Sequence, residues 1–309
     1  MRRERSPTVT ALAVVLLGTA ASSGPAQATD HQPPSWQVVW RDDFDGGQGH
    51  LPSSDDWIVD TGTGYPGGAS SWGTGEIQTY TADPSTIALD GRGNLTITPR
   101  RDDAGAWTSA RVETRRSDFT APEGGVLRIE GRLRMPDVAG DAALGYWPAF
   151  WALGAPYRGD YWNWPDVGEI DVAENVDGVD RVWGVLHCGT ASGGPCDEPE
   201  GRAGTAVCPG SPCRSAFHTY RFEWDRGVSP DRLRWYVDEQ EFHSVGAADV
   251  DAVAWAAMTS HSGFFLLLDV AVGGGFPDAV AGVDTPTAAT VPGEPMVVDH
   301  VSVSTKAGR

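Results

Sequence analysis

The sequence predicts an all-β protein, a two-sheet antiparallel β-sandwich of the jelly-roll kind. Three observations favour this class. The apolar segments are short and rich in β-branched and aromatic residues, which is typical of strands. Glycine and proline, with 39 and 22 residues among 309, separate these segments and leave no room for long helices. No helical segments alternate with the strands, which excludes the βαβ pattern of a parallel sheet.

Residues 1–28 have the three parts of a secretory signal peptide. Met1–Arg5 is basic, Val9–Ala21 is apolar but too short to span a bilayer, and small residues precede the expected cleavage point. A short buried helix is the alternative for the apolar part. We expect a secreted, extracellular protein with a polar leader at 29–35. One domain is expected at 36–305, because no linker or repeat interrupts that range.

The expected strands follow one another between turn signals. In chain order they are Gln37–Trp40, Asn94–Thr98, Gly125–Leu133, Tyr220–Trp224, Leu233–Val237, Phe264–Val272 and Met296–Val303. Tight turns are indicated at Asp90–Asn94 and Val237–Gln240, where glycine, asparagine and aspartate gather. Only Asp249–Met258 has a pattern that fits a short helix.

Acidic residues dominate the charge, with 42 Asp and Glu against 23 Lys and Arg and a formal net charge of −19. Such a surface repels nucleic acid and anionic lipid, so neither is expected as a partner. It suits a neutral substrate better than a sulfated or uronic one. The apolar run Phe264–Leu268 ends at Asp269 and is too short to cross a membrane. We expect a monomer without a membrane partner.

All four cysteines, Cys188, Cys196, Cys208 and Cys213, lie close together in the chain. In an exported protein they predict two local disulfides that staple one long loop, because the segment between them is rich in glycine and proline. Three pairings are open, and nearest-neighbour pairing is slightly favoured. Zinc is the weaker alternative, since no C-x-x-C pair is present.

Three acidic residues stand in the short run Glu169-Ile170-Asp171-Val172-Ala173-Glu174. A helix would point Glu169 away from the other two acids, whereas a strand places Glu169 and Asp171 on one face. Strict alternation would turn Glu174 to the opposite face. One extra residue, a β-bulge, returns Glu174 to the face of the other acids.

Carboxylates gathered on one face repel one another, so at least one of their pKa values should rise. Glycoside hydrolysis uses such a pair, one ionised as nucleophile and one protonated as acid, about 5–5.5 Å apart in retaining enzymes. A solvated acidic strand or a calcium site is the alternative.

Aromatic residues around the acids favour the glycosidase interpretation. The chain has 13 tryptophans, and several cluster just before the acids. Indole rings combine an apolar face for sugar C–H groups with an N–H donor. Trp147 and Trp151 lie in an apolar run, so at least one is expected in the core. Trp162 and Trp164 have polar neighbours and are expected to form cleft walls.

With these motifs the chain resembles glycoside hydrolase family 16, in particular its bacterial laminarinase-like endo-β-1,3-glucanases. The motifs that carry the resemblance are Val39–Gly46, Trp72–Tyr80, Trp147–Trp151, the E-x-D-x-x-E run from Glu169 to Glu174, and Val298–Val303. The resemblance covers nearly all of the mature chain. It implies a concanavalin-like jelly roll with a concave cleft. It also implies retaining double displacement on a neutral β-glucan, with no cofactor required.

The resemblance also implies roles for single residues. Glu169 is expected to be the nucleophile, Asp171 the assisting carboxylate and Glu174 the general acid/base. Trp164 should border the −1 sugar, and His187 should face the cleft from the adjacent strand. A neutral, packed histidine is the alternative for His187.

Glu76 and Arg111 occupy positions that the family associates with sugar contacts, although a plain surface pair is the alternative. The family often binds a structural calcium ion on its convex side, which implies Asp299 and Asp43 as ligands.

Three substrate-facing segments depart from the family pattern: Ser71–Glu76, His187–Gly189 and Val272–Pro277. Linkage preference therefore stays open, with mixed-linkage β-1,3-1,4-glucan, β-galactan or a transglycosylation acceptor as alternatives. A non-catalytic carbohydrate-binding protein on the same fold is a further alternative, but it would need a broken acid trio, and here all three acids are present.

Overall fold

The computed structural model describes residues 35–308. The predicted signal peptide and all but the last residue of the predicted leader lie outside the described residues. No helix within 35–308 has the length and apolar character needed to cross a membrane.

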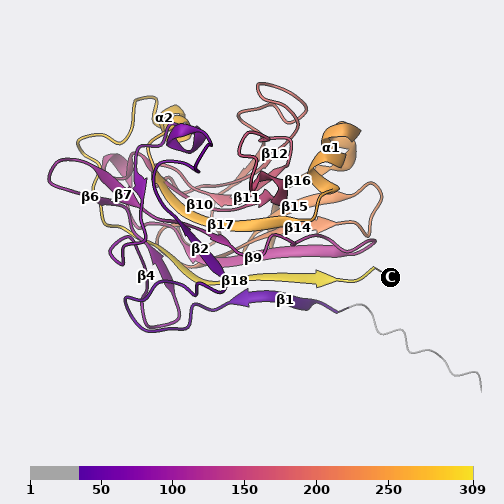
Figure 1. Ribbon diagram of the computed structural model, residues 1–309, viewed down its shortest axis with the longest axis horizontal. Coiled ribbons are helices and arrows are strands. Elements are labelled where there is room, and N and C mark those ends of the chain that lie inside the picture. The colour runs from indigo at the N-terminus through magenta and orange to yellow at the C-terminus, as the bar shows by residue number, and fades with distance from the viewer. Residues whose placement is uncertain (1–34, 309) are drawn as a thin grey trace, which may run out of the picture. The chain divides into compact units, whose positions relative to one another are not determined.

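Within residues 35–308, two large antiparallel sheets face each other, and a small third sheet lies at one edge (Figure 1). The inner sheet is ordered β16 (Gln240–Gly246), β15 (Arg232–Val237), β14 (His218–Asp225), β9 (Val126–Arg134), β18 (Met296–Lys306), β5 (Leu95–Ile97) and β4 (Ile87–Leu89), and β1 (Gln37–Asp42) also pairs with β18. The cleft sheet is ordered β13 (Arg202–Ala206), β12 (Val182–His187), β11 (Glu169–Glu174), β10 (Tyr146–Gly154), β17 (Phe264–Val272), β8 (Arg111–Thr114) and β2 (Trp57–Asp60). The small sheet contains β3 (Thr79–Tyr80), β7 (Trp107–Ser109) and β6 (Arg100–Arg101). This is a jelly roll, so the predicted fold class is confirmed.

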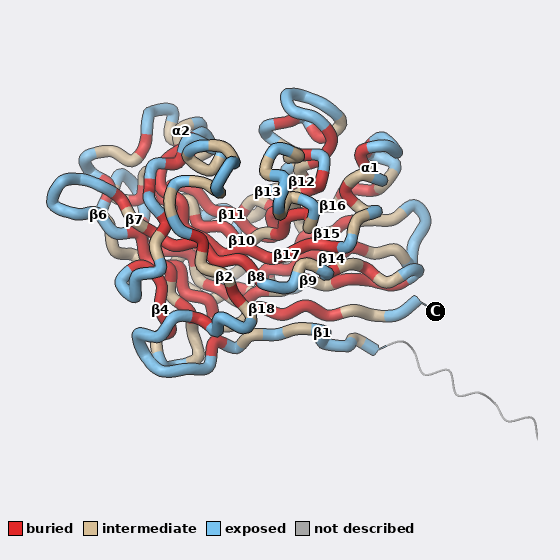
Figure 2. The backbone as a smooth tube through the Cα atoms, in the orientation of Figure 1, coloured by how far each residue is buried: buried red, intermediate tan, exposed pale blue. Residues whose placement is uncertain are grey.

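The main hydrophobic core lies between the two large sheets. Strand β9 of the inner sheet buries every second residue against it, in the alternation that a one-sided strand requires. Strand β17 of the cleft sheet is buried along its whole length, as Figure 2 shows in red. Its second face is therefore covered too, in part by the loop residues Val167, Tyr157 and Trp164, which pack with Phe265 and Leu267 of this strand.

Two short α-helices interrupt the strands among the described residues. Helix α1 (Ala252–Thr259) was predicted, and the Asp251 carboxylate caps it by accepting the N–H groups of Val253 and Ala254. Helix α2 (Gly275–Ala281) was not predicted, because glycines at both of its ends disguise it as a loop. Single turns of 3-10 helix lie at Ser70–Gly73, Gly140–Ala143, Ala155–Tyr157 and Ala247–Asp249.

The predicted β-bulge lies in the middle of β11. Asp171 pairs with Val185 of β12 and Glu174 with Trp183, so Val172 and Ala173 together face Gly184. Val172 and Ala173 are both buried in the core. The bulge thereby turns Glu174 back to the face of the other two acids, as the sequence predicts.

Position 184 requires a glycine, because Trp235 of the inner sheet occupies the space that a side chain would need. A Cβ atom on Gly184 would lie 2.5 Å from Trp235 Cδ1. The Trp235 indole instead donates a hydrogen bond of 2.8 Å to the carbonyl oxygen of Asp171. The bulge is thus fixed from below by a side chain of the opposite sheet.

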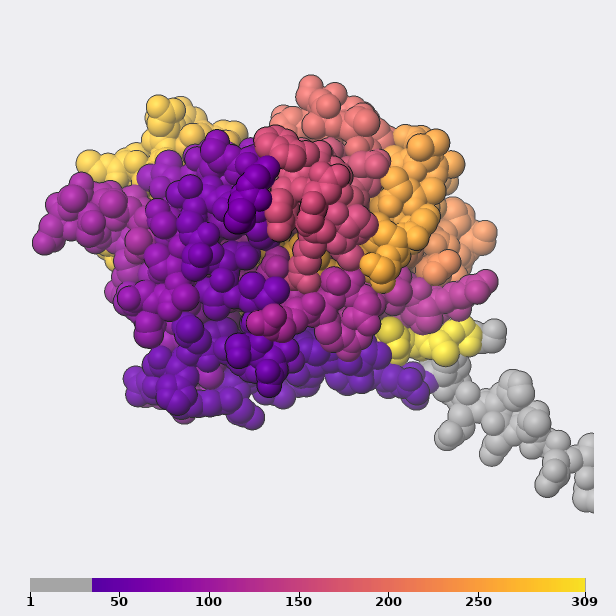
Figure 3. All heavy atoms as spheres, viewed as in Figure 1, coloured from indigo at the N-terminus to yellow at the C-terminus, as the bar shows by residue number. Residues whose placement is uncertain are grey.

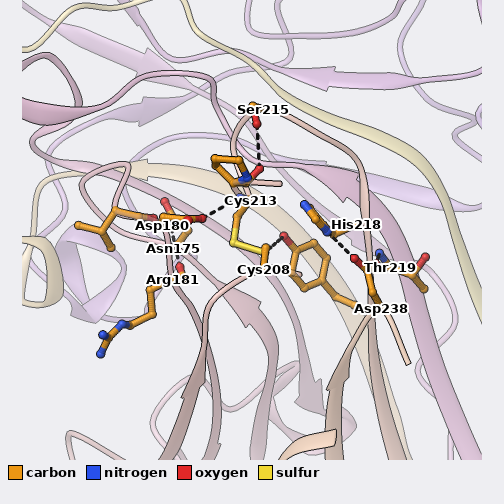
Figure 4. The surroundings of a disulfide bond; sticks show 12 residues. Asn175, Asp180, Arg181, Cys208, Cys213, Ser215, His218, Thr219 and Asp238 are labelled. Carbon is orange, nitrogen blue, oxygen red and sulfur yellow. Dashed lines mark hydrogen bonds and ion pairs between the residues drawn. A yellow bond between two sulfur atoms is a disulfide. The ribbon is translucent and has the colours of Figure 1, made fainter. Parts of the chain in front are cut away.

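The cysteines form the disulfides Cys188–Cys196 and Cys208–Cys213, the nearest-neighbour pairing. They do not staple one long loop, which corrects the prediction, because β13 (Arg202–Ala206) separates them. The first bridge closes the loop before β13 and the second closes the loop after it. Figure 4 shows the bridge between Cys208 and Cys213. The Tyr220 hydroxyl lies 3.4 Å from the Cys208 sulfur.

Candidate active site

Strand register brings charged side chains from neighbouring strands into one row on the face of the cleft sheet that points away from the core. The row runs from β11 to β2 through Glu174, Ala149, Asp269, Arg111 and Asp60. A cavity of about 320 Å³ lies over it. All three acids of β11 line this cavity together with Glu76, Arg111 and Asp269.

The three acids of β11 lie on one face, as the sequence predicts. The residues between them, Ile170, Val172 and Ala173, pack into the core on the other face. Asp171 and Glu174 are buried and Glu169 is partly exposed. One oxygen each of Glu169 and Asp171 and one nitrogen of His187 lie within 4.8 Å of one another.

The two glutamates of this trio have different electrostatic surroundings. Burial raises the pKa of Glu169 to about 8 and Asp171 adds to the rise, while His187 and Arg111 oppose it. Burial raises the pKa of Glu174 well above its ordinary value, with a further contribution from Asp171 and against the hydrogen bond from Trp147. That bond joins Trp147 Nε1 to Glu174 Oε1 at 2.8 Å. Burial and Asp171 thus favour the protonated form of both glutamates, while His187 and Arg111 oppose it at Glu169 and Trp147 and His187 oppose it at Glu174.

His187, at the end of β12, lies opposite Glu169 in the strand register. Its Nε2 is 3.3 Å from Asp171 Oδ2, and its Nδ1 is 2.7 Å from Glu198 Oε2. Burial alone would lower the pKa of His187, but the contacts with Asp171 and Glu198 raise it well above its ordinary value. These two carboxylate contacts favour the charged form of His187, and its role toward the sugar stays a prediction.

Arg111 is buried beside the cavity, in the middle of a network of acids and aromatic rings. Its Nε donates to Asp60 Oδ2 at 3.2 Å, and its Nη2 donates to the Tyr65 hydroxyl at 3.1 Å. The guanidinium lies over the rings of Trp72 and Trp151, 4.5 and 4.8 Å from their centroids. This stacking fixes the plane of the guanidinium at the cavity wall.

Glu76 shares the cavity wall with Arg111, and it too is buried. Burial raises its pKa to about 8, with a contribution from Asp269 and against the charge of Arg111. Its Oε1 has no hydrogen-bond partner among the described residues. The alternative of a plain surface pair is wrong, because both residues line the cavity and neither is exposed.

Individual relatives and solved structures, and not a family model, show which family the chain belongs to. No family model matches the chain. A β-glucanase of Rhodothermus marinus is 33% identical over 286 residues, which cover 87% of this chain and 85% of the relative. The solved structure of an endo-1,3-β-glucanase from Streptomyces sioyaensis is 53% identical and superposes with a TM-score of 0.85, covering 92% of this chain and 99% of that one. An endo-β-1,3-glucanase from Pyrococcus furiosus is 27% identical, with a TM-score of 0.69 over 89% of this chain and 96% of that one.

The chain belongs to glycoside hydrolase family 16. Membership confirms the resemblance carried by the E-x-D-x-x-E run, and it makes the protein a glycoside hydrolase.

The four tryptophans singled out from the sequence all line the cavity of this family 16 enzyme: Trp147, Trp151, Trp162 and Trp164. Trp147 and Trp151 are both partly buried, and Trp151 also packs against a small second hydrophobic cluster, so the expectation that one of them joins the core holds for Trp151 in part. Both follow the cleft-facing alternation of β10, whose other residues, such as Phe150, fill the core. Trp162 is 70% exposed. Its indole donates to the Gly67 carbonyl at 2.8 Å.

Two loops meet above the cleft near Trp162. Tyr65 and Tyr161 stack with their ring centroids 4.4 Å apart and an interplanar angle of 3°. In Figure 3 the indigo segment around residues 61–75 lies directly against the rose segment around 155–168. Trp164 lies deeper, 5.7 Å from the His187 ring. The aromatic rings thus extend from the acids to the rim of the cleft.

The structural calcium site that the family resemblance implies at Asp43 and Asp299 stays a prediction, and both carboxylates contact cations of the protein. Asp43 is paired with Arg41 at an exposed position, and Asp299 is 3.1 Å from Arg132 and 3.0 Å from His300. Within residues 35–308, no third acidic side chain completes a ligand group with them. These carboxylates balance cations of the protein itself.

Sequence reasoning missed several members of the site. Asp269 accepts hydrogen bonds from Trp151 Nε1 at 2.7 Å and the Tyr80 hydroxyl at 3.1 Å. Burial raises its pKa to about 6 against the charge of Arg111. A single aspartate inside an apolar strand was the signal that could have found it. Asp60 and Glu198 carry no such signal, because only the fold brings them to the cleft.

Proposed function

We propose that this protein is a secreted, retaining endo-β-1,3-glucanase that acts on a laminarin-like, neutral β-glucan by double displacement. The observation that carries the proposal is the bulged strand β11, which presents Glu169, Asp171 and Glu174 to one tryptophan-lined cavity. The 1,3 linkage is supported by the relatives from Streptomyces sioyaensis and Pyrococcus furiosus, whose names specify it.

In the first step, Glu174 donates its proton to the glycosidic oxygen while a Glu169 oxygen forms a bond to the anomeric carbon. The C–O bond to the leaving sugar breaks, and a glycosyl ester on Glu169 remains. In the second step, Glu174, now ionised, takes a proton from water, and the water oxygen displaces Glu169. The product regains the β configuration, and no cofactor takes part.

The electrostatics of the cleft support this division of roles. The acid must hold a proton at working pH and the nucleophile must be free of one. Burial and Asp171 favour a protonated Glu174, and the charges of His187 and Arg111 favour ionisation of Glu169. Asp171, between them, disfavours a second negative charge on Glu174 and is the assisting carboxylate.

The sugar-binding roles follow from the same cavity. We assign Trp164 to the wall beside the reacting sugar and His187 to the cleft floor, held against Asp171. Trp147, Trp151 and Trp162 offer stacking surfaces, and Glu76 and Arg111 offer hydrogen-bonding groups for hydroxyls.

Secretion is supported by the two disulfides, which persist in an oxidising compartment, and by the signal-peptide pattern of residues 1–28. Residues 36–305 constitute the proposed catalytic domain, which acts as a monomer.

Reducing-sugar release from a panel of purified polysaccharides tests the substrate. Laminarin should be cleaved fastest, with oligosaccharides of several lengths appearing early, as endo-cleavage requires. Faster cleavage of mixed-linkage glucan or β-galactan would change the assigned substrate, but the protein would still be a glycoside hydrolase. Binding of laminarin without release of reducing ends would contradict the proposal and favour a carbohydrate-binding protein.

A further inference from the structure

A buried glutamate outside the strands reaches the catalytic trio from behind. Glu198 lies in the loop between β12 and β13, which the Cys188–Cys196 disulfide closes. Its side chain is 0% exposed. Oε2 is 2.7 Å from His187 Nδ1, and Oε1 accepts the N–H of Cys188 at 2.9 Å. Both carboxylate oxygens are therefore used, one on the backbone beside the disulfide and one on the histidine.

The loop itself holds Glu198 in this position. Glu198 lies two residues beyond Cys196, and its backbone exchanges two hydrogen bonds of 2.6 Å with Gly193. Gly193 lies inside the ring that the disulfide closes. A buried carboxylate without a cation would be costly, and His187 is the cation that it contacts. The pair is thus built into the fold.

His187 connects Glu198 to the catalytic trio through Asp171. Its other nitrogen, Nε2, is 3.3 Å from Asp171 Oδ2, a buried oxygen that has no hydrogen-bond partner within residues 35–308. Asp171 therefore depends on the charge of His187 for compensation. The ionisable groups that face this pair are Glu169 and Glu174 on β11, Glu198 in the loop, Arg111 on β8 and Asp269 on β17.

We propose that Glu198 is a positioning residue that keeps His187 protonated and aimed at Asp171, and that the Cys188–Cys196 bridge holds Glu198 in place. The proposal rests on the function proposed above, because it gives the histidine a task in ionising Glu169. Glu198 contacts His187, and His187 contacts Asp171. Loss of the Glu198 carboxylate should therefore let His187 lose its proton.

Replacement of Glu198 by glutamine separates this role from packing. Glutamine keeps the shape, and with its oxygen accepting the Cys188 N–H its NH2 group faces His187 Nδ1, to which it can donate only if that nitrogen has lost its proton. His187 then becomes neutral, and the nearby carboxylates lose their closest compensating charge. Loss of the His187 charge raises the pKa of Glu169 and loss of the Glu198 charge lowers it; the effect of the histidine is the larger, so the acidic limb of the kcat/KM profile should move to higher pH.

Titration of His187 by NMR tests the first link directly. In 13C-histidine-labelled protein, with the signal assigned by His187→Gln, wild type should stay protonated well above the ordinary histidine pKa. Glu198→Gln should lower that pKa by about one unit or more, and Glu198→Asp should largely preserve it. The matched control is Glu200→Gln, because Glu200 is exposed on the same loop and the charge change is identical. An unchanged His187 pKa in Glu198→Gln, or an equal shift in both glutamine variants, would overturn the proposal.

The pH profile on laminarin is the second arm. An acidic limb that stays in place or moves to lower pH in Glu198→Gln would mean that His187 keeps its charge without Glu198, which contradicts the proposal. Cys188→Ser/Cys196→Ser should move the limb in the same direction as Glu198→Gln, whereas Cys208→Ser/Cys213→Ser should not. Equal behaviour of the two disulfide variants would remove the bridge from this role. The NMR titration needs no substrate, so failure of the proposed function would leave it intact.

Discussion

Trp147 and His187 give the acids of β11 two different environments. The indole N–H lies on Glu174 deep in the cleft, and the imidazolium lies on Asp171 beside Glu169. The indole bond favours ionisation of Glu174, so the proton on Glu174 depends on burial and on Asp171, whereas His187 and Arg111 favour ionisation of Glu169. Two identical side chains can then act as acid and as nucleophile at one pH.

Replacement of Glu174 by alanine should reveal its role through the leaving group. General acid assistance contributes about 10²–10⁴-fold when the leaving group is a sugar hydroxyl. An activated aryl β-glucoside needs no proton, so its glycosylation rate should fall far less than that of laminarin. Single-turnover kinetics on both substrates measure the two losses. Equal losses would remove Glu174 from the role of acid.

At the scale of residues, the three acids and their shared face could be predicted from the sequence. The alternation of side chains and the bulge are both local properties of one strand. The network of Arg111 could not be predicted in this way. Asp60 and Tyr65 come from one segment and Asp269 from another, both far from Arg111 in the chain, and the fold brings them to the guanidinium.

At the scale of elements, the bulge in β11 depends on an empty space in β12. Gly184→Ala would place a Cβ atom 2.5 Å from Trp235 and 2.9 Å from Phe242. Such overpacking costs about 1–3 kcal/mol and should shift Trp235 off the Asp171 carbonyl. We expect a lower melting temperature together with a lower kcat.

Gly275→Ala in α2 is the matched control, because its Cβ atom would meet only Thr74 O at 3.7 Å. Alanine in a helix should leave stability unchanged or raise it by about 0.5–1 kcal/mol. Thermal melts and laminarin kinetics compare the two variants. A Gly184→Ala protein that melts and turns over like Gly275→Ala would show that the bulge does not need Trp235.

Long strands such as β9, β17 and β18 could be predicted because alternation or continuous apolar sequence marks them. Strand β13 and helix α2 could not. The sequence Arg202-Ala203-Gly204-Thr205-Ala206 has little apolar character, and the strand exists because it pairs with β12. Helix α2 lies between positive-φ glycines that read as turns.

At the scale of the whole molecule, buried acids with raised pKa values set how stability depends on pH. Glu76 and Glu169 rise to about 8, Asp60 and Asp269 to about 6, each mainly through burial. A group whose pKa is raised by folding stabilises the fold fully below its unfolded pKa. That contribution is lost as pH rises through the folded pKa.

The melting temperature should therefore fall between pH 5 and pH 8. His243 and His261 oppose this trend, since burial lowers their pKa values, but they are fewer. Glu76→Gln should flatten the slope because the amide stays neutral, and the exposed Glu200→Gln should not. A melting temperature that rises steadily from pH 5 to pH 8 would contradict the assignment of raised pKa values.

The stereochemistry of the first product tests the central claim most directly. The claim is that Glu169 and Glu174, brought to one face by the bulge, cleave the glycosidic bond by two displacements. Retention needs carboxylates about 5–5.5 Å apart, whereas inversion needs about 6.5–9.5 Å to admit a water. Proton NMR of laminarin-oligosaccharide hydrolysis should show the β-anomer first, with the α-anomer growing only at the rate of mutarotation. Appearance of the α-anomer first would contradict the account.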